Sequence, residues 1–258
     1  MKALTLAACL LVLTGCGGSS APAGGATARS TASPTAGQAA PLTVFAAASL
    51  KEVLTDLGRT YERRHPGARV TFSFAGSQTL VAQIQQGAPA DVLATADAAS
   101  AASVAPELTG TPEILARNQL SILVAPGNPL HLTTLADLAR PAVKVVLAGP
   151  TVPAGKAARK ALAAAGVSVK QVSDEPDVKA VLAKVRLGEA DAGIAYVTDA
   201  RAAQGAVDGI TLPGISNVYP AAALKNAAHP AAATAFLAFL VSVDAQAVFR
   251  SYGFLPPA

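Results

Sequence analysis

Short apolar runs alternate with helical patterns along most of this chain, and turns of small residues separate them. Buried strands read as continuous or alternating apolar runs, whereas helices repeat apolar residues every third or fourth position. Strands are predicted at 42–46, 69–74, 92–94, 120–125, 143–148, 192–197 and 218–224. Helices are predicted to begin at Ser49 and Ser77 and to cover 153–165, 178–187 and, as two helices, 230–252. This alternation predicts an α/β fold of mostly parallel sheets flanked by helices.

The part of the chain from residue 42 onward is long for a single open sheet, so two lobes are predicted. In folds of this class, ligands bind at the carboxyl ends of strands, where the N-termini of helices converge. The turns that follow the predicted strands are therefore the first places to look for function.

The N-terminus has the pattern of a signal peptide, predicted at residues 1–15, in which Lys2 precedes a short apolar stretch. Leu13-Thr14-Gly15-Cys16 resembles the bacterial lipobox, in which cleavage precedes a cysteine that is then acylated. Residues 16–40 are rich in Gly, Ser, Ala, Thr and Pro, and they are predicted to form a flexible tether. The apolar runs at 3–15 and 231–243 are shorter than the roughly 20 residues of a membrane-spanning helix.

Composition excludes several classes of protein. A hydrophobic content of 52% excludes disorder for most of the chain, and two cysteines, both before residue 17, exclude a disulfide scaffold. The net charge is +4, but Lys2 and Arg29 supply half of it and lie before residue 41. The remainder shows neither clustered basic residues nor interleaved aromatic residues, so no nucleic-acid partner is expected.

Three strand-to-helix turns, at 45–50, 74–80 and 149–156, consist largely of small residues. Each is expected to place unpaired backbone N–H groups at the mouth of a crevice, which is an anion site that needs no charged side chain. The first two turns add a serine hydroxyl, from Ser49 and Ser77. Either serine could instead be an ordinary helix N-cap, which contributes about 1 kcal/mol.

The motifs of common enzymes are absent from the sequence. The turn at 149–156 has five residues between its glycines, where a phosphate-binding loop has four, and Ala157 stands where that loop has Ser or Thr. No Gly-x-Ser-x-Gly motif is present. Single histidines and scattered aspartates are expected on the surface, in loops or at helix starts, without metal or acid–base roles: His65, His131, His229, Asp91, Asp97, Asp191 and Asp199.

An ordered set of motifs resembles the periplasmic molybdate-binding proteins of ABC importers over residues 42–258. The motifs are Val44-Phe45-Ala46-Ala47-Ala48-Ser49-Leu50, Gly87-Ala88-Pro89-Ala90-Asp91-Val92, Val152-Pro153-Ala154-Gly155, Gly193-Ile194-Ala195-Tyr196 and Tyr252-Gly253-Phe254. The resemblance implies the two-lobe periplasmic-binding-protein fold of type II, with two crossing strands as hinge. It also implies one tetrahedral oxyanion held between the lobes, without a metal or cofactor.

The resemblance places the family's ligand residues on this chain. Ser49 and Ser77 match its serines, and Tyr196 matches the tyrosine whose hydroxyl donates. Ala154 and Val178 match residues that donate through the backbone N–H. Serines of some relatives are replaced here at positions 76 and 78 by Gly and Gln, which affects only accessory hydroxyl contacts.

The resemblance also implies an organisation and a role. Lobe 1 is expected at 42–120 plus 221–258 and lobe 2 at 121–220, with crossings near 120–126 and 218–223. The chain is expected to be a monomeric extracytoplasmic receptor, anchored by a lipid on Cys16, that delivers molybdate or tungstate to an ABC permease. Neutral donors favour a fully ionised oxyanion over hydrogen phosphate, whose proton would face a donor, but they do not exclude sulfate. A receptor of the same fold for sulfate or another small oxyanion is the alternative, and a serine hydrolase or phosphoryl-transfer enzyme is less favoured.

Overall fold

The computed structural model describes residues 40–257, which belong to one compact unit. The predicted signal peptide, Cys16 and the tether up to residue 39 lie outside the described residues.

Strands and helices alternate in the order that the apolar pattern predicts. The strands are β1 (Pro41–Ala47), β2 (Arg69–Ala75), β3 (Val92–Ala94), β4 (Glu113–Val124), β5 (Val145–Ala148), β6 (Gln171–Glu175), β7 (Ala192–Tyr196) and β8 (Asp208–Ala223). The α-helices are α1 (Lys51–Arg64), α2 (Ser77–Gln85), α3 (Ala98–Ala102), α4 (Pro153–Ala164), α5 (Val178–Arg186), α6 (Val197–Ala202), α7 (Pro230–Leu240) and α8 (Val243–Ser251). Short 3₁₀ helices are η1 (Ala48–Leu50), η2 (Ala105–Glu107) and η3 (Ala136–Ala139).

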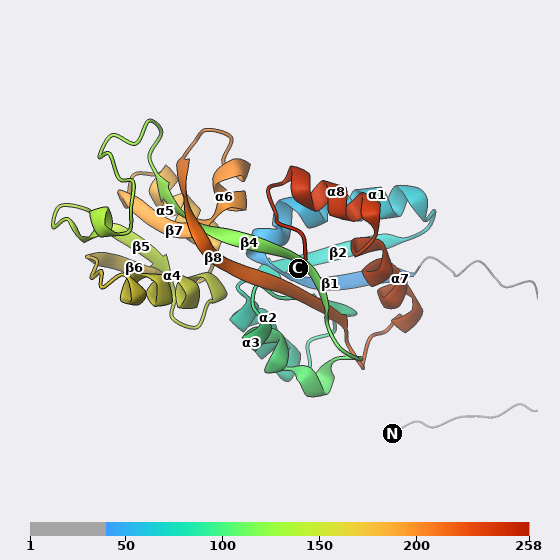
Figure 1. Cartoon of the computed structure of the whole chain (residues 1–258). Coiled ribbons are helices and arrows are strands. Elements are labelled where there is room, and N and C mark those ends of the chain that lie inside the picture. The colour runs from blue at the N-terminus through green and yellow to red at the C-terminus, as the bar shows by residue number, and fades with distance from the viewer. Residues whose placement is uncertain (1–39, 258) are drawn as a thin grey trace, which may run out of the picture. The chain divides into compact units, whose positions relative to one another are not determined.

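The strands form one mixed sheet in the order β2-β1-β3-β8-β4-β7-β5-β6. β1 pairs in parallel with β2 and β3, and β5 pairs in parallel with β6 and β7. The long strands β4 and β8 are antiparallel to each other and run through the middle of the fold (Figure 1). The predicted α/β class is therefore confirmed, with a mixed sheet whose parallel parts lie on either side of two long antiparallel strands.

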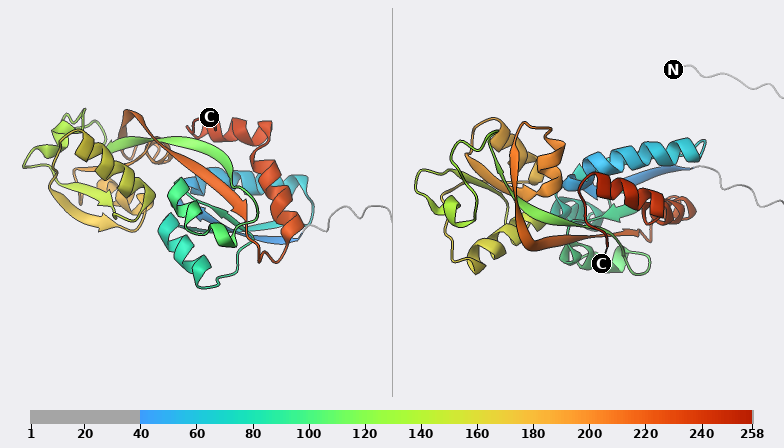
Figure 2. Two further views of the ribbon diagram at one scale, coloured as in Figure 1. Left: turned by 60° about the horizontal axis from the view of Figure 1, so that its bottom comes forward. Right: turned by 45° about the horizontal axis from the view of Figure 1, so that its top comes forward.

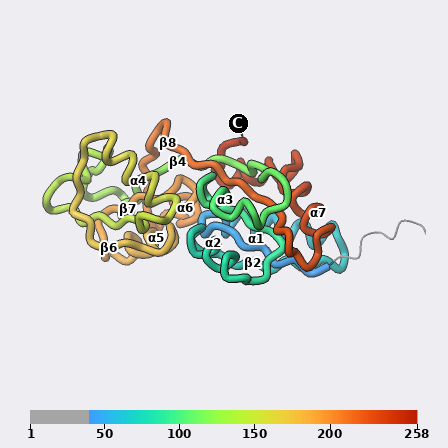
Figure 3. The backbone as a smooth tube through the Cα atoms, turned by 90° about the horizontal axis from the view of Figure 1, so that it is seen from below, coloured from blue at the N-terminus to red at the C-terminus, as the bar shows by residue number. Residues whose placement is uncertain are grey.

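Buried side chains form separate cores on the two sides of β4 and β8. One side, which we name lobe 1, buries residues between 42 and 116 and between 219 and 254. The other side, lobe 2, buries residues between 120 and 212, with Ala48 reaching in from lobe 1. Figures 2 and 3 show the helices gathered in two groups: α4, α5 and α6 in lobe 2, and α1, α2, α3, α7 and α8 in lobe 1.

β4 and β8 begin earlier than the apolar pattern predicts. The predictions of 120–125 and 218–224 were too short, because polar residues interrupt both strands ahead of their apolar ends. Arg117, Asn118 and Gln119 pair with Val218, Asn217 and Ser216 of β8 in the observed sheet. The pattern also missed β6, an edge strand of mostly exposed polar residues, and the short helices α3 and α6.

None of the helices that the structure describes is by itself long and apolar enough to cross a membrane. Together, α7 and α8 reach the necessary length and composition, but they are bent by 61° at the break between them.

Candidate functional site

A small cavity lies where the turns predicted from the sequence meet. Its lining comes from the turns after β1 and β2, the starts of α4 and α5, the end of β7 and one residue after β3: Ala47, Ala48, Ser49, Ala75, Gly76, Ser77, Ala96, Val152, Pro153, Ala154, Asp177, Val178 and Tyr196. All five residues proposed as ligands are therefore brought together. None of them is more than 3% exposed.

The size of the cavity limits what it can hold. The space open to the centre of a water-sized sphere is about 10 Å³, and one water molecule needs about 10–15 Å³ by the same measure. In this arrangement the cavity is too small for a sugar, a nucleotide or a peptide.

Neither serine caps its helix, so the N-cap interpretation is wrong for both. Ser77 is the first residue of α2, and no side chain caps that helix. Its Oγ instead accepts a hydrogen bond of 3.0 Å from the backbone N–H of Ala96. Because that N–H must donate, the hydroxyl hydrogen of Ser77 remains available to an acceptor in the cavity.

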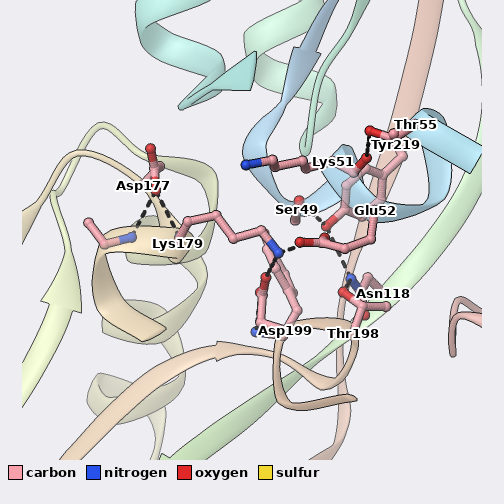
Figure 4. A network of polar contacts seen from close by, with 12 residues as sticks. Ser49, Lys51, Glu52, Thr55, Asn118, Asp177, Lys179, Thr198, Asp199 and Tyr219 are labelled. Carbon is pink, nitrogen blue, oxygen red and sulfur yellow. Dashed lines mark hydrogen bonds and ion pairs between the residues drawn. The ribbon is translucent and has the colours of Figure 1, made fainter. Parts of the chain in front are cut away.

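Ser49 lies in η1, also without a capping bond. Its Oγ is 2.9 Å from the hydroxyl oxygen of Tyr219, whose oxygen is 3.3 Å from Asn118 Nδ2. When Asn118 donates to Tyr219 and Tyr219 donates to Ser49, the hydrogen of Ser49 is free for the cavity, as it is in Ser77. Figure 4 shows this buried chain of side chains.

Two helix N-termini contribute backbone donors. Ala154 and Val178 lie in the first turns of α4 and α5, where N–H groups have no carbonyl one turn earlier to bond. No acceptor among the described residues bonds either N–H. Gly155 is needed for the approach of α4 to the strand before it, because a Cβ there would lie 2.1 Å from the carbonyl oxygen of Gly149.

Tyr196 ends β7 and turns its hydroxyl toward the cavity side of β8. The hydroxyl oxygen accepts a hydrogen bond of 2.8 Å from Asn217 Nδ2. Burial raises the pKa of the Tyr196 phenol well above its ordinary value. The phenol therefore stays protonated and can donate at physiological pH.

The lining contains no basic side chain, and its one charged group is engaged in capping a helix. Asp177 caps α5, where its Oδ1 accepts from the N–H groups of Lys179 and Ala180. The positive ends of three helix dipoles, those of α2, α4 and α5, meet at the cavity. Among residues 40–257 no group of three or more His, Cys, Asp and Glu side chains is placed to hold a metal ion. The site offers neutral donors, an arrangement suited to an anion.

Ion pairs also join the two lobes. Lys179 of α5 lies 2.7 Å from Glu52 Oε2 in lobe 1 and 2.9 Å from Asp199 Oδ1 in lobe 2 (Figure 4). Lys156 of α4 lies 2.7 Å from Asp97 in lobe 1.

The replacements at positions 76 and 78 also belong to this contact between lobes. Gln78 Nε2 donates to the carbonyl of Pro176 at 3.0 Å. A Cβ on Gly76 would lie 2.5 Å from that same carbonyl oxygen. Gly76 thus permits the lobes to approach this closely.

Some residues proved more important than the sequence suggested. Asp199 begins a helix as expected, but it is also fully buried and paired with Lys179. His229 is only half-exposed, and its backbone N–H donates to the carboxylate of the buried Asp91. Asn118, Asn217 and Tyr219 were not considered as site residues. The only sign of them in the sequence is that they are polar residues in or beside predicted strands. A search for apolar runs does not detect such residues.

The fold and the site define a class: a two-lobe binding protein for a small anion. A family model for bacterial extracellular solute-binding proteins matches residues 42–255, so the chain belongs to that family, whose members act outside the cytoplasm. The molybdate-binding protein ModA of Mycobacterium tuberculosis is 42% identical over 235 residues, which cover 89% of this chain and 90% of that protein.

Solved structures share the fold. The periplasmic molybdate-binding protein of Azotobacter vinelandii superimposes with a TM-score of 0.73 at 22% identity, covering 84% of this chain and all of that one (100%). The sulfate-binding protein SubI of Mycobacterium tuberculosis also gives a TM-score of 0.73, at 21% identity, covering 84% of this chain and 86% of that one. At these identities the likeness concerns the fold alone.

Proposed function

We propose that this protein is an extracytoplasmic receptor that binds molybdate or tungstate between its lobes and delivers the anion to an ABC importer. The observation that carries the proposal is the small buried cavity in which hydroxyl and N–H donors from both lobes meet without a basic side chain. The identity of 42% to a molybdate-binding protein over nearly the whole chain supports the same ligand.

We propose Ser49, Ser77, Ala154, Val178 and Tyr196 as the ligand residues. Their hydroxyl and N–H groups are neutral, and each has a hydrogen to give. A fully ionised tetrahedral oxyanion can accept all of these bonds. Hydrogen phosphate would set its own proton against a donor and leave both groups unpaired, which costs binding free energy.

Isothermal titration calorimetry of the purified protein with molybdate, tungstate, sulfate and phosphate tests the function. We expect tight binding of molybdate and tungstate, weaker binding of sulfate, and no measurable binding of phosphate. Comparable affinity for sulfate would favour the alternative receptor of the same fold. Absence of molybdate binding would refute the proposal.

Further elements of the proposal concern organisation and location. The lobes are proposed to be 42–120 plus 221–258 and 121–220, and their closure on the anion is proposed to create the surface that the permease recognises. The chain is proposed to be a monomer held at the membrane by a lipid on Cys16. A mature protein whose mass shows no lipid would exclude that anchor.

The backbone donor at Val178 can be removed with little change in structure. Proline is well tolerated at the first position of a helix, and Asp177 is extended (φ −162°, ψ 179°), outside the α region that a following proline disfavours. Val178→Pro should weaken molybdate binding by about 10- to 150-fold, the value of one hydrogen bond to a charged group. Val178→Ala is the matched control in calorimetry, because it removes the side chain and keeps the N–H. Equal losses in the two variants would show that packing, and not the N–H, matters at this position.

A further inference from the structure

Asn217 lies in the middle of β8, outside the cavity lining, and contacts both lobes. Its Nδ2 is 2.9 Å from the carbonyl oxygen of Ala96 in lobe 1 and 2.8 Å from the hydroxyl oxygen of Tyr196 in lobe 2. Across the sheet it pairs with Asn118 of β4. One amide nitrogen on a crossing strand therefore joins the lobes beside the cavity.

The contact with Ala96 fixes the orientation of the amide. A backbone carbonyl can only accept, so the group that faces it is the nitrogen of Asn217 and not the oxygen. This nitrogen has two hydrogens, one for the carbonyl of Ala96 and one for Tyr196. The hydroxyl oxygen of Tyr196 is consequently an acceptor toward Asn217. Its own hydrogen is not used by that contact and is available to an anion in the cavity, for which the neighbouring Tyr219 hydroxyl is the competing acceptor.

Ala96 orders a second hydroxyl in the same way. Its N–H donates to Ser77 Oγ at 3.0 Å, while its carbonyl accepts from Asn217. The residue is 4% exposed and lines the cavity. Through its two backbone groups, Ala96 connects the hydroxyls of Ser77 and Tyr196, which come from opposite lobes, and both are left as donors.

We propose that Asn217 is a positioning residue for anion binding, one that holds the Tyr196 hydroxyl as a donor to the anion and links this donor to lobe 1. The inference rests on the proposed function, because it assumes that the cavity receives an oxyanion. Asn217 acts only through Tyr196, so its contribution to affinity exists only while the tyrosine hydroxyl is present.

A double-mutant cycle measured by calorimetry with molybdate tests this dependence. Tyr196→Phe should weaken binding by about 10- to 150-fold, and Asn217→Ala by about 10-fold. In the Tyr196→Phe background, Asn217→Ala should change affinity less than about twofold, since the two substitutions remove one interaction. Asn226→Ala, at an exposed asparagine, is the matched control and should leave affinity unchanged.

A change of charge at the same position gives a second readout. The carboxylate of Asn217→Asp would accept the hydrogen of Tyr196 and face the carbonyl of Ala96, so this variant should lose more affinity than Asn217→Ala. Thermal denaturation in the absence of the anion shows which variants remain folded. If Asn217→Ala does not fold, Asn217→Ser takes its place in the double-mutant cycle.

Two outcomes separate the inference from the function on which it rests. If the wild-type protein binds molybdate but Asn217→Ala causes the same loss with and without the Tyr196 hydroxyl, Asn217 is merely structural and the inference is overturned. If the wild-type protein binds no molybdate, the proposed function itself is wrong.

Discussion

Replacing both Ser49 and Ser77 with alanine is expected to weaken molybdate binding by about 10²- to 10⁴-fold, since each hydrogen bond to a charged group contributes about 1.5–3 kcal/mol. Both hydroxyls are buried. The N–H of Ala96 leaves Ser77 with a hydrogen for the cavity, and Tyr219 does the same for Ser49 when its hydroxyl donates. Calorimetry with molybdate measures the loss, and the single variants should each account for part of it.

The same substitutions should lower stability, and the control has to separate the two effects. Ser77→Ala leaves the buried N–H of Ala96 without its partner, which costs about 1–3 kcal/mol of unfolding free energy. Affinity is therefore compared well below the melting temperature of each variant. Ser121→Ala is the matched control, because Ser121 is 1% exposed and lies outside the cavity lining. Reduced stability with unchanged affinity in the double variant would mean that the serines only support the fold.

Lys179→Met is expected to reduce the free energy of unfolding by about 3–5 kcal/mol, the usual cost of removing one partner of a buried ion pair. The side chain of Lys179 is 23% exposed, but Asp199 is fully buried and would lose its cationic partner. Chemical denaturation measures the loss. For a domain of this size, it corresponds to a decrease in Tm of about 6–20 °C.

Lys184→Met provides the matched control on the same helix. Lys184 pairs with Glu189, and both side chains are substantially exposed, at 37% and 49%. An exposed pair of this kind contributes at most about 1 kcal/mol. If Lys179→Met and Lys184→Met were equally stable, the buried pair of Lys179 and Asp199 would contribute no more to stability than the exposed pair.

The pH dependence of the free energy of unfolding should follow from the charges around Lys179. Burial by itself would lower the pKa of Lys179, but Asp199 and Glu52 outweigh it and raise the pKa above its ordinary value. A lysine with a raised pKa in the folded state contributes its full stability below the unfolded value of 10.5 and loses it as the pH rises through the folded value. The wild-type protein should therefore lose more stability than Lys179→Met in this alkaline range. Denaturation curves at a series of pH values would show it, and parallel losses would contradict it.

Local pattern was enough to predict most of the strands and helices. The apolar run at 42–46 and the helix 153–165 agree with β1 and α4 to within one residue at every end. The pattern was insufficient where a strand is polar. β6 lies at the edge of the sheet and buries little, and β4 and β8 carry polar side chains where they pass the cavity. In both cases these residues form a strand because of where they lie in the sheet, and hydropathy does not reveal that position.

The sequence by itself predicted the small-residue turns of the site, and the family resemblance added Val178 and Tyr196. The turns after β1 and β2 converge because the carboxyl ends of neighbouring parallel strands lie at one edge of a sheet. Only the tertiary structure decided how those residues are used. Whether a serine caps a helix or presents its hydrogen to a cavity depends on the group across from it, and those groups, Ala96 and Tyr219, are 19 and 170 residues away along the chain. Hydrogen-bond direction is set by such distant partners, and no local pattern in the sequence encodes it.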